Sequence, residues 1–282
     1  MSFAVIFAAL MIWFGGWWMN ARLARIRGGR GAGALAPILF GVTVLVLWEL
    51  LVRGLGVPGA ILPPPSAIGQ AFAANLPTLW ADFIQTFVKG ALSGYVIGCS
   101  VAFAMALAVD RSDFLKRGLL PVGNFMAALP IIGMAPIFVM WFGFGWQSKA
   151  AVVAVMCFFP MLVNTVQGLA AADRMQADLM RTYAASPLQT LMKLKLPAAG
   201  PFIFNGLKIC TTLALIGAIV AEFFGSPTLG MGFRISTQVG RLALDMVWAV
   251  ILVAALAGSA FYGVVTLLER AATFWHPSQR GR

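Results

Sequence analysis

The sequence predicts an all-α membrane protein, a polytopic bundle of six core transmembrane helices with one further helix at the N-terminus. Composition is the first observation: hydrophobic residues make up 61% of the 282 residues, and the mean hydropathy is +0.90. Only 10% of the residues are charged, whereas a soluble domain carries roughly a quarter. The second observation is that the apolar residues form runs close to the ~20 residues that a membrane crossing requires.

Seven segments are candidates for such crossings, although the first is short. They are Phe3–Met19, Ala34–Val52, Thr86–Val109, Leu119–Trp141, Ala150–Gly168, Pro201–Phe224 and Met246–Leu268. The first segment is followed by basic residues and preceded by none, so its N-terminus is predicted to face outward. A signal peptide is the alternative, but a charged leader and a small-residue cleavage site are both missing. The expected organisation is therefore a helix with a basic linker over residues 1–33 and a membrane domain over residues 34–282.

The basic residues orient this bundle. Four cations lie on one side if every segment spans: Arg53, Lys149, Arg234 and Arg241. Fourteen of the 20 lie on the other: Arg22, Arg25, Arg27, Arg30, Arg111, Lys116, Arg117, Arg174, Arg181, Lys193, Lys195, Arg270, Arg280 and Arg282. Cytoplasmic loops collect positive residues. The net charge of +11 therefore indicates membrane topology, and nucleic acid is not an expected partner.

A polar stretch from Ala170 to Pro197 separates the fifth and sixth candidate spans and falls on the cytoplasmic side. Its residues favour a helix from Ala177 to about Ala184. Ser186-Pro187 then pairs a capping residue with proline at the first helical position, which predicts a second helix over Leu188–Leu196. The stretch is either an ordinary amphipathic loop that packs on the bundle or a structure that a soluble partner binds.

This stretch resembles the EAA loop of ABC importer permeases, in which Glu-Ala-Ala, three residues and a glycine precede an Ile-x-Leu-Pro ending. Asp178-Leu179-Met180 stands at the Glu-Ala-Ala position, Ala184 at the glycine, and Leu194-Lys195-Leu196-Pro197 at the end. Asp178 keeps the carboxylate with one methylene fewer. Ala184 lacks the freedom of glycine for positive φ, so the turn is expected to be more helical than is usual in the family.

The resemblance extends over the whole chain after about residue 34, to the nitrate, sulfonate and taurine branch of these permeases. Thr228 departs from that pattern, because it replaces the first glycine of the Gly-Leu-Gly turn. The matching positions are Trp48–Leu51, Leu62–Ser66, Leu129-Pro130, Ala135-Pro136, Trp141–Gly145, Asn164-Thr165, Gly168, Gly206–Lys208, and Glu222 followed by Leu229-Gly230. The resemblance implies a permease subunit of a binding-protein-dependent ABC importer, located in a bacterial inner membrane.

The same resemblance implies the partners. The sequence contains no Gly-x-x-x-x-Gly-Lys-Ser/Thr phosphate loop, so ATP and Mg²⁺ are expected on separate ATPase subunits, with no cofactor, metal or enzymatic activity on this chain. A second permease copy or a related permease, and an extracytoplasmic substrate-binding protein, are the other expected partners. The residues expected to dock and couple the ATPase are Asp178, Arg181, Ala184, Ala185, Ser186, Pro187 and Gln189.

Prolines and glycine interrupt the span Leu119–Trp141 and suggest where the translocation path lies. Backbone groups freed by such breaks are tolerated at membrane depth where they are buried or line a cavity, and methionine offers an adaptable apolar surface. Plain packing is the alternative for each residue taken alone. The expected path residues are Met126, Pro130, Gly133, Met134 and Pro136.

Charged residues within the spans also have structural interpretations. Glu49 and Arg53 are one helical turn apart and predict an ion pair. Lys208 is expected to snorkel or to find an acidic partner. Glu222 is expected to hold the following Gly-rich turn, which gives Glu222 and Gly230 a structural or gating role.

The remaining expectations concern the segment around Ser66, the cysteines and the histidine. Gly54–Ser66 is too rich in Gly and Pro to be helical, and Ser66 is expected to cap an interfacial helix over Ala67–Trp80. The three cysteines, Cys99, Cys157 and Cys210, lie in apolar runs and are expected to be small core residues. His276 is the only histidine, which excludes a histidine-based metal or triad site within one chain.

A secondary transporter or channel is the alternative function. It requires intramembrane acids for ion coupling and usually inverted repeats, and interior acids are nearly absent here. The substrate is expected to be a small organic solute. Glu222–Pro227 and Met231–Arg234 resemble the pyrimidine-precursor side of this branch. That resemblance slightly favours a thiamine-related pyrimidine or riboflavin, with nitrate, sulfonates and taurine close behind.

Overall fold

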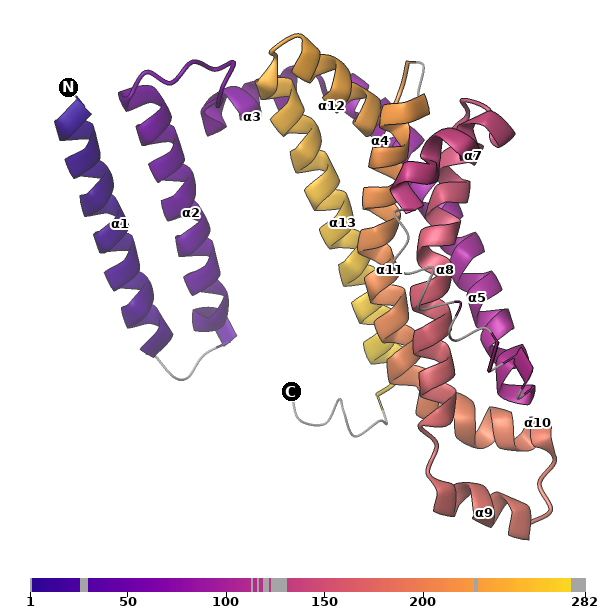
Figure 1. Cartoon of the computed structure of the whole chain (residues 1–282). Helices are drawn as coiled ribbons and strands as arrows, with labels where there is room; N and C mark the ends of the chain where they lie inside the picture. The colour runs from indigo at the N-terminus through magenta and orange to yellow at the C-terminus, as the bar shows by residue number, and fades with distance from the viewer. Residues whose placement is uncertain are drawn as a thin grey trace. The chain divides into compact units, whose positions relative to one another are not determined.

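The computed structural model describes residues 2–25, 30–112, 114–115, 117–118, 122, 131–225 and 228–274. These residues form helices joined by short turns, with no strand among them (Figure 1). Six helical segments within them are long and apolar enough to cross a membrane: Phe3–Leu23, Leu35–Gly54, Leu76–Arg111, Trp146–Ala170, Pro187–Gly225 and Leu244–Ala272. The all-α membrane bundle predicted from composition is confirmed.

About half of the predicted span Leu119–Trp141 lies outside the described residues, namely 119–121 and 123–130. Its described end consists of a 3-10 turn, η2 (Ile131–Met134), followed by the short helix α7 (Ala135–Phe142). Six of the seven predicted spans therefore have a helical counterpart, and the structure describes only the last part of the remaining one.

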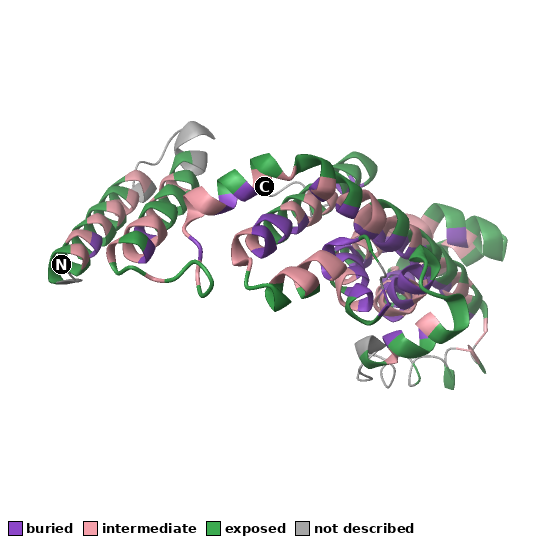
Figure 2. Cartoon of the chain, turned by 90° about the horizontal axis from the view of Figure 1, so that it is seen from above, coloured by how far each residue is buried: buried purple, intermediate pink, exposed green. Residues whose placement is uncertain are grey.

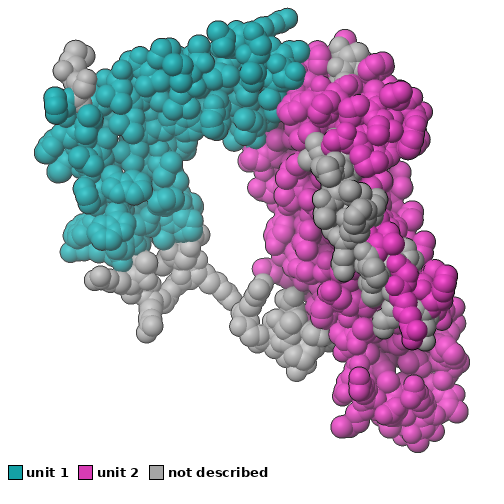
Figure 3. Space-filling model, viewed as in Figure 1, with its two compact units in different colours: residues 1–79, 235–252 teal, residues 80–234, 253–282 magenta. Residues whose placement is uncertain are grey.

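Figure 3 shows that the chain divides into two compact units, residues 1–79 with 235–252 and residues 80–234 with 253–282. The first unit contains α1 (Ser2–Arg25), α2 (Arg30–Gly54) and α3 (Pro65–Ala74). Helices α1 and α2 pack against each other so closely that a Cβ added at Gly16 or Gly54 would collide with Thr43 or Val5. The boundary between residues 33 and 34 stays a prediction.

The second unit is built on α5 (Ser93–Arg111), α8 (Trp146–Ala170) and α11 (Leu196–Gly225). Gly94 and Gly98 bring the backbone of α5 against α8, a close approach that small residues permit in membrane bundles. Cys99, Cys157 and Cys210 are free thiols in this core, as expected of small core residues. Half of an apolar 18-residue stretch of α8 is buried, whereas only 6% of the corresponding stretch of α1 is. The hairpin of α1 and α2 is mostly exposed (Figure 2).

The structure corrects the boundaries of several elements. Ser66 does not cap a helix: α3 begins at Pro65 after Pro64, and Ser66 hydrogen-bonds to Glu49 of α2 instead. The interfacial helix expected over Ala67–Trp80 is two helices, since Asn75 separates α3 from α4 (Leu76–Phe83). Helical structure then continues through η1 (Ile84–Leu92), a π-helical segment, into α5.

Pro197 and Pro201 do not separate the loop helix from the following span. Helix α10 (Pro187–Thr190) passes through a π-helical segment, η3 (Leu191–Lys195), directly into α11. The π-helical segment ends two residues before Pro197, where irregular hydrogen bonding accommodates a residue without an N–H, and Pro201 lies inside α11. The predicted span Pro201–Phe224 is therefore the last part of a helical run that begins at Pro187. After α11, the chain forms α12 (Met231–Gly240) and α13 (Leu244–Ala272).

Candidate functional site

The loop between α8 and α11 is the first candidate site, and its two helices are held by local hydrogen bonds. Helix α9 (Arg174–Thr182) begins at Asp173, whose carboxylate accepts from the Met175 backbone N–H at 3.2 Å. Helix α10 begins with a capping box. The Gln189 backbone donates to Ser186 Oγ at 3.3 Å, and the Ser186 backbone donates to Gln189 Oε1 at 2.8 Å. Each helix start is thus specified by residues within three positions of it.

The turn between these helices differs from the sequence expectation. Ala184 has φ +50°, so the left-handed conformation typical of a glycine is present without one. The N–H of Ala184 donates to Arg181 O at 2.9 Å, and that of Ala185 donates to Met180 O at 2.9 Å. These two bonds form a Schellman motif, which satisfies the last carbonyls of α9. The expectation of a more helical turn was wrong, because the closing bonds outweigh the strain of a Cβ at positive φ.

The predicted docking residues lie together on this loop. Asp178 and Arg181 form an exposed ion pair on α9 at 3.2 Å, Ala184 and Ala185 make the turn, and Ser186, Pro187 and Gln189 begin α10. Sequence reasoning missed an exposed apolar stripe of Met175, Leu179 and Tyr183 at a spacing of four residues. These side chains are 78%, 55% and 78% exposed. Helical periodicity could have revealed them.

A cavity of about 750 Å³ adjoins this loop, between the ends of α5 and α10. Asp110 and Lys195 line it and form an ion pair at 2.8 Å. Arg181, Ser186 and Pro187 contribute to its lining. The ion pair fixes the base of the loop on the bundle, while the tip of the loop stays exposed.

The predicted path residues are only partly described. Met126 and Pro130 lie outside the described residues. Gly133 and Met134 are in the 3-10 turn, and Pro136 is an exposed residue in the first turn of α7. Met134 packs against a buried cluster of Ala135, Phe138, Val152 and Ala221. The 3-10 turn passes directly into α7, and the break expected around Pro130 stays a prediction.

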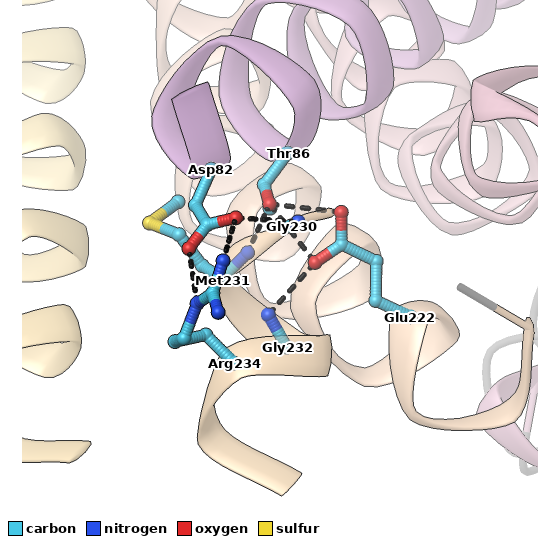
Figure 4. Close-up of polar contacts among 7 residues, drawn as sticks. All are labelled: Asp82, Thr86, Glu222, Gly230, Met231, Gly232 and Arg234. Atoms are coloured by element: carbon cyan, nitrogen blue, oxygen red, sulfur yellow. Dashed lines mark hydrogen bonds and ion pairs between the residues drawn. The ribbon is translucent and has the colours of Figure 1, made fainter. Parts of the chain in front are cut away.

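A buried polar network at the start of α12 is the second candidate site (Figure 4). The carboxylate of Asp82 in α4 accepts hydrogen bonds from Arg234 Nε at 2.8 Å and from the backbone N–H of Gly230 at 2.8 Å. Glu222 of α11 accepts from Thr86 Oγ1 at 2.8 Å and from the Gly232 N–H at 2.7 Å. Asp82, Thr86 and Glu222 are each no more than 2% exposed.

The network gives the first N–H groups of α12 their partners. Such groups have none within the helix and carry the positive end of its dipole, so carboxylates stabilise them. Thr86 links Glu222 to the start of α12, because its hydroxyl accepts from the Met231 N–H at 2.7 Å while it donates to Glu222. Glu222 therefore holds the Gly-rich turn, as its position suggested, whereas Asp82 and Thr86 escaped sequence reasoning because they lie more than 130 residues away.

Lys149 was counted among the cations of an outer loop, but its side chain is 1% exposed. Its Nζ donates to Phe144 O at 2.8 Å and to Gly225 O. The ammonium thus joins the turn after α7 to the last carbonyl of α11, the negative end of that helix dipole. Gly225 also packs directly against Val139 of α7.

The two other predicted ion contacts are present. Glu49 and Arg53 form an ion pair, and both bind Ser66. Lys208 pairs with Glu269 of α13 at 2.9 Å. Within the described ranges, no three His, Cys, Asp or Glu side chains are grouped so as to hold a metal ion.

The model of the family described as "Binding-protein-dependent transport system inner membrane component" matches residues 94–273. The chain belongs to this family. The match begins in α5 and includes both candidate sites except for Asp82 and Thr86. The protein is therefore a membrane-spanning permease subunit of an ABC import system.

Relatives agree with this assignment. A probable ABC transporter permease of Haemophilus influenzae is 31% identical, over 78% of this chain and 89% of its own length. The formylaminopyrimidine transport permease of Halalkalibacterium halodurans is 29% identical, over 89% of this chain and 99% of its own. The riboflavin transport permease of Chloroflexus aurantiacus is 30% identical, over 83% and 88%.

A putative aliphatic sulfonate permease of Bacillus subtilis is also 29% identical, over 93% of this chain and 95% of its own. Among solved structures, an inward-facing MetNI methionine ABC transporter aligns with 70% of this chain and 95% of its own, with a TM-score of 0.53 and 22% identity. This last likeness concerns the fold.

Proposed function

We propose that this chain forms, with a second permease subunit, the translocation path of an importer in a bacterial inner membrane, and that separate ATPase subunits drive it. An extracytoplasmic binding protein delivers the solute. Closure of the ATPases displaces the α9–α10 loop, and the bundle alternates between inward-open and outward-open states. The chain itself performs no covalent chemistry.

The observation that carries this proposal is the form of the α9–α10 loop. Its helices are closed by their own caps, its tip is exposed, and its apolar stripe of Met175, Leu179 and Tyr183 has no covering among the described residues. Exposed apolar residues rimmed by charges mark protein interaction sites. The pair Asp178–Arg181 and the capped start of α10 lie beside this stripe.

A pull-down of the cognate ATPase tests the docking assignment. Asp178→Trp and Ser186→Trp place a bulky ring at the proposed contact, and we expect both to weaken ATPase retention while the bundle still folds. Ile61→Trp is the matched control, because Ile61 is 68% exposed in the loop before α3. Retention that is unchanged by both substitutions and by deletion of residues 178–189 contradicts the assignment.

For the substrate, we propose a small organic solute, with a thiamine-related pyrimidine or riboflavin ahead of sulfonates, nitrate and taurine. The formylaminopyrimidine and riboflavin relatives support this order, although the sulfonate relative is equally similar. Thermal shift of the associated binding protein with each solute measures the preference. Stabilisation by taurine or a sulfonate, and by neither heterocycle, would reverse the order.

A secondary transporter, the alternative function, would differ in the energy source that uptake requires. Uptake by the importer requires ATP and persists when the proton gradient is dissipated. Uptake that survives ATP depletion and collapses with the proton gradient would contradict the proposal.

A further inference from the structure

Two asparagines form a hydrogen-bonded pair on an exposed face of α8 and α11. Asn205 Nδ2 donates to Asn164 Oδ1 at 2.9 Å, and Asn164 Nδ2 donates to Pro160 O at 2.8 Å. Asn205 is exposed, and no described residue donates to its Oδ1. The pair therefore keeps acceptor and donor capacity directed away from its own bundle.

Both residues lie inside segments with the length and hydropathy of a membrane span. Asn164 is six residues from the end of α8 at Ala170, about 9 Å at the helical rise. Asn205 is nine residues after Leu196, the start of α11, or about 14 Å. An amide is costly to place in hydrocarbon, so an exposed amide at this depth faces water or another protein surface.

Two more uncharged polar residues extend this face along the same helices. Gln167 is exposed one turn after Asn164, and Thr212 is exposed two turns after Asn205. Lys208 lies between Asn205 and Thr212, but its ammonium is paired with Glu269 at 2.9 Å.

Helix α5 gives a comparison. Its exposed residues include the apolar Val96, Ile97 and Val101 together with Ser100, and Arg111 is exposed at its end. The exposed residues of α11 include the apolar Ile209 and Ile216 beside Asn205 and Thr212. What distinguishes the face of α8 and α11 is therefore its exposed amides, Gln167 and Asn205, because α5 contains no Asn or Gln.

We infer that Asn164, Gln167, Asn205 and Thr212 form a polar strip on the wall of the translocation path, which hydrogen-bonds a neutral solute with adjacent donors and acceptors. An amide presents both kinds of group side by side and matches the edge of an amino-substituted heterocycle. A sulfonate is better bound by free cations. This inference rests on the proposed transport function and gives the path a location separate from η2 and α7.

Thiol labelling in inside-out membrane vesicles tests whether the strip faces water. Asn205→Cys is compared with Val101→Cys, which is 51% exposed and ten residues from the same-side end of α5. The native cysteines are at most 5% exposed, so the unsubstituted chain gives the background. We expect a charged methanethiosulfonate reagent to label Asn205→Cys about tenfold faster, because the reactive thiolate forms in water. Equal rates would overturn the inference, since the strip would then face lipid or a second subunit.

Protection from labelling tests the solute class. With Gln167→Cys in the whole transporter, we expect 4-aminopyrimidine or riboflavin to slow labelling about twofold at a concentration equal to its Kd, and taurine to leave it unchanged. Protection by taurine alone, or by none of the three, overturns the assignment to neutral heterocycles. The ATPase pull-down is independent of both measurements, so a failed docking assignment and a failed strip are distinguishable.

Discussion

The α9–α10 loop and the buried network at the start of α12 satisfy their backbone hydrogen-bonding groups in opposite ways. The loop is closed by bonds between residues at most five positions apart, and its ion pair Asp178–Arg181 is exposed. The network joins α4, η1, α11 and α12 through carboxylates that are fully desolvated. The comparison teaches that the loop can keep its local form while it moves against a partner, whereas the network ties its helices into one body.

The largest expected effect comes from breaking the buried Asp–Arg pair and comparing it with the exposed one. Asp82→Asn breaks the buried ion pair with Arg234, and we expect a loss of about 3 to 5 kcal/mol in the free energy of unfolding. Asp178→Asn removes the exposed pair and is expected to cost about 0.2 to 1 kcal/mol. Urea unfolding in detergent measures both. Equal losses would show that the two regions do not differ as proposed.

A smaller effect is expected from adding one methyl group inside the network. A Cβ at Gly232 would collide with the carbonyl of Ile219 and with Glu222, so Gly232→Ala should cost about 1 to 3 kcal/mol. Gly240→Ala, on the same helix, meets open space and should be neutral or slightly stabilising. The thermal midpoints of the two variants in detergent give the comparison, and a stable Gly232→Ala variant would contradict the close packing.

The smallest expected effect is on the stability of the turn at Ala184 in the α9–α10 loop. Ala184→Gly relieves the strain of positive φ, which is only partly offset by the greater freedom of glycine in the unfolded chain, and should stabilise the turn by about 0.5 kcal/mol. Ala185→Gly, at a neighbouring residue without positive φ, should destabilise it by a similar amount. Amide hydrogen exchange at the end of α9 measures both. Slower exchange in Ala185→Gly than in Ala184→Gly would contradict the strain.

These regions also explain what could be predicted from the sequence. The caps of α10 depend on Ser186, Pro187 and Gln189, so a local pattern was sufficient to place them. The contacts of Asp82 with Arg234 and of Lys149 with Gly225 depend on how separate helices pack, which no local pattern encodes. Charge counting even placed Lys149 in a loop, because it treats every cation near a span end as solvated.

Ala184 illustrates the remaining limit. Its residue type disfavours a left-handed turn, and the expectation followed that preference. The two closing bonds from Ala184 and Ala185 are worth more than the local cost. Conformational preference alone therefore predicted the wrong turn at the position where the sequence departs from its family.

The continuous helix from Pro187 to Gly225 has a mechanical consequence. Its 39 residues amount to about 58 Å of helical backbone at the usual rise. The Ser186 cap lies at one end, and Lys149 donates a hydrogen bond to the carbonyl of Gly225 at the other. With the Gly225 end held in place, a tilt of the helix by one degree displaces the Ser186 end by about 1 Å. Small rotations of the helix about its fixed end therefore produce displacements of several ångströms at the loop.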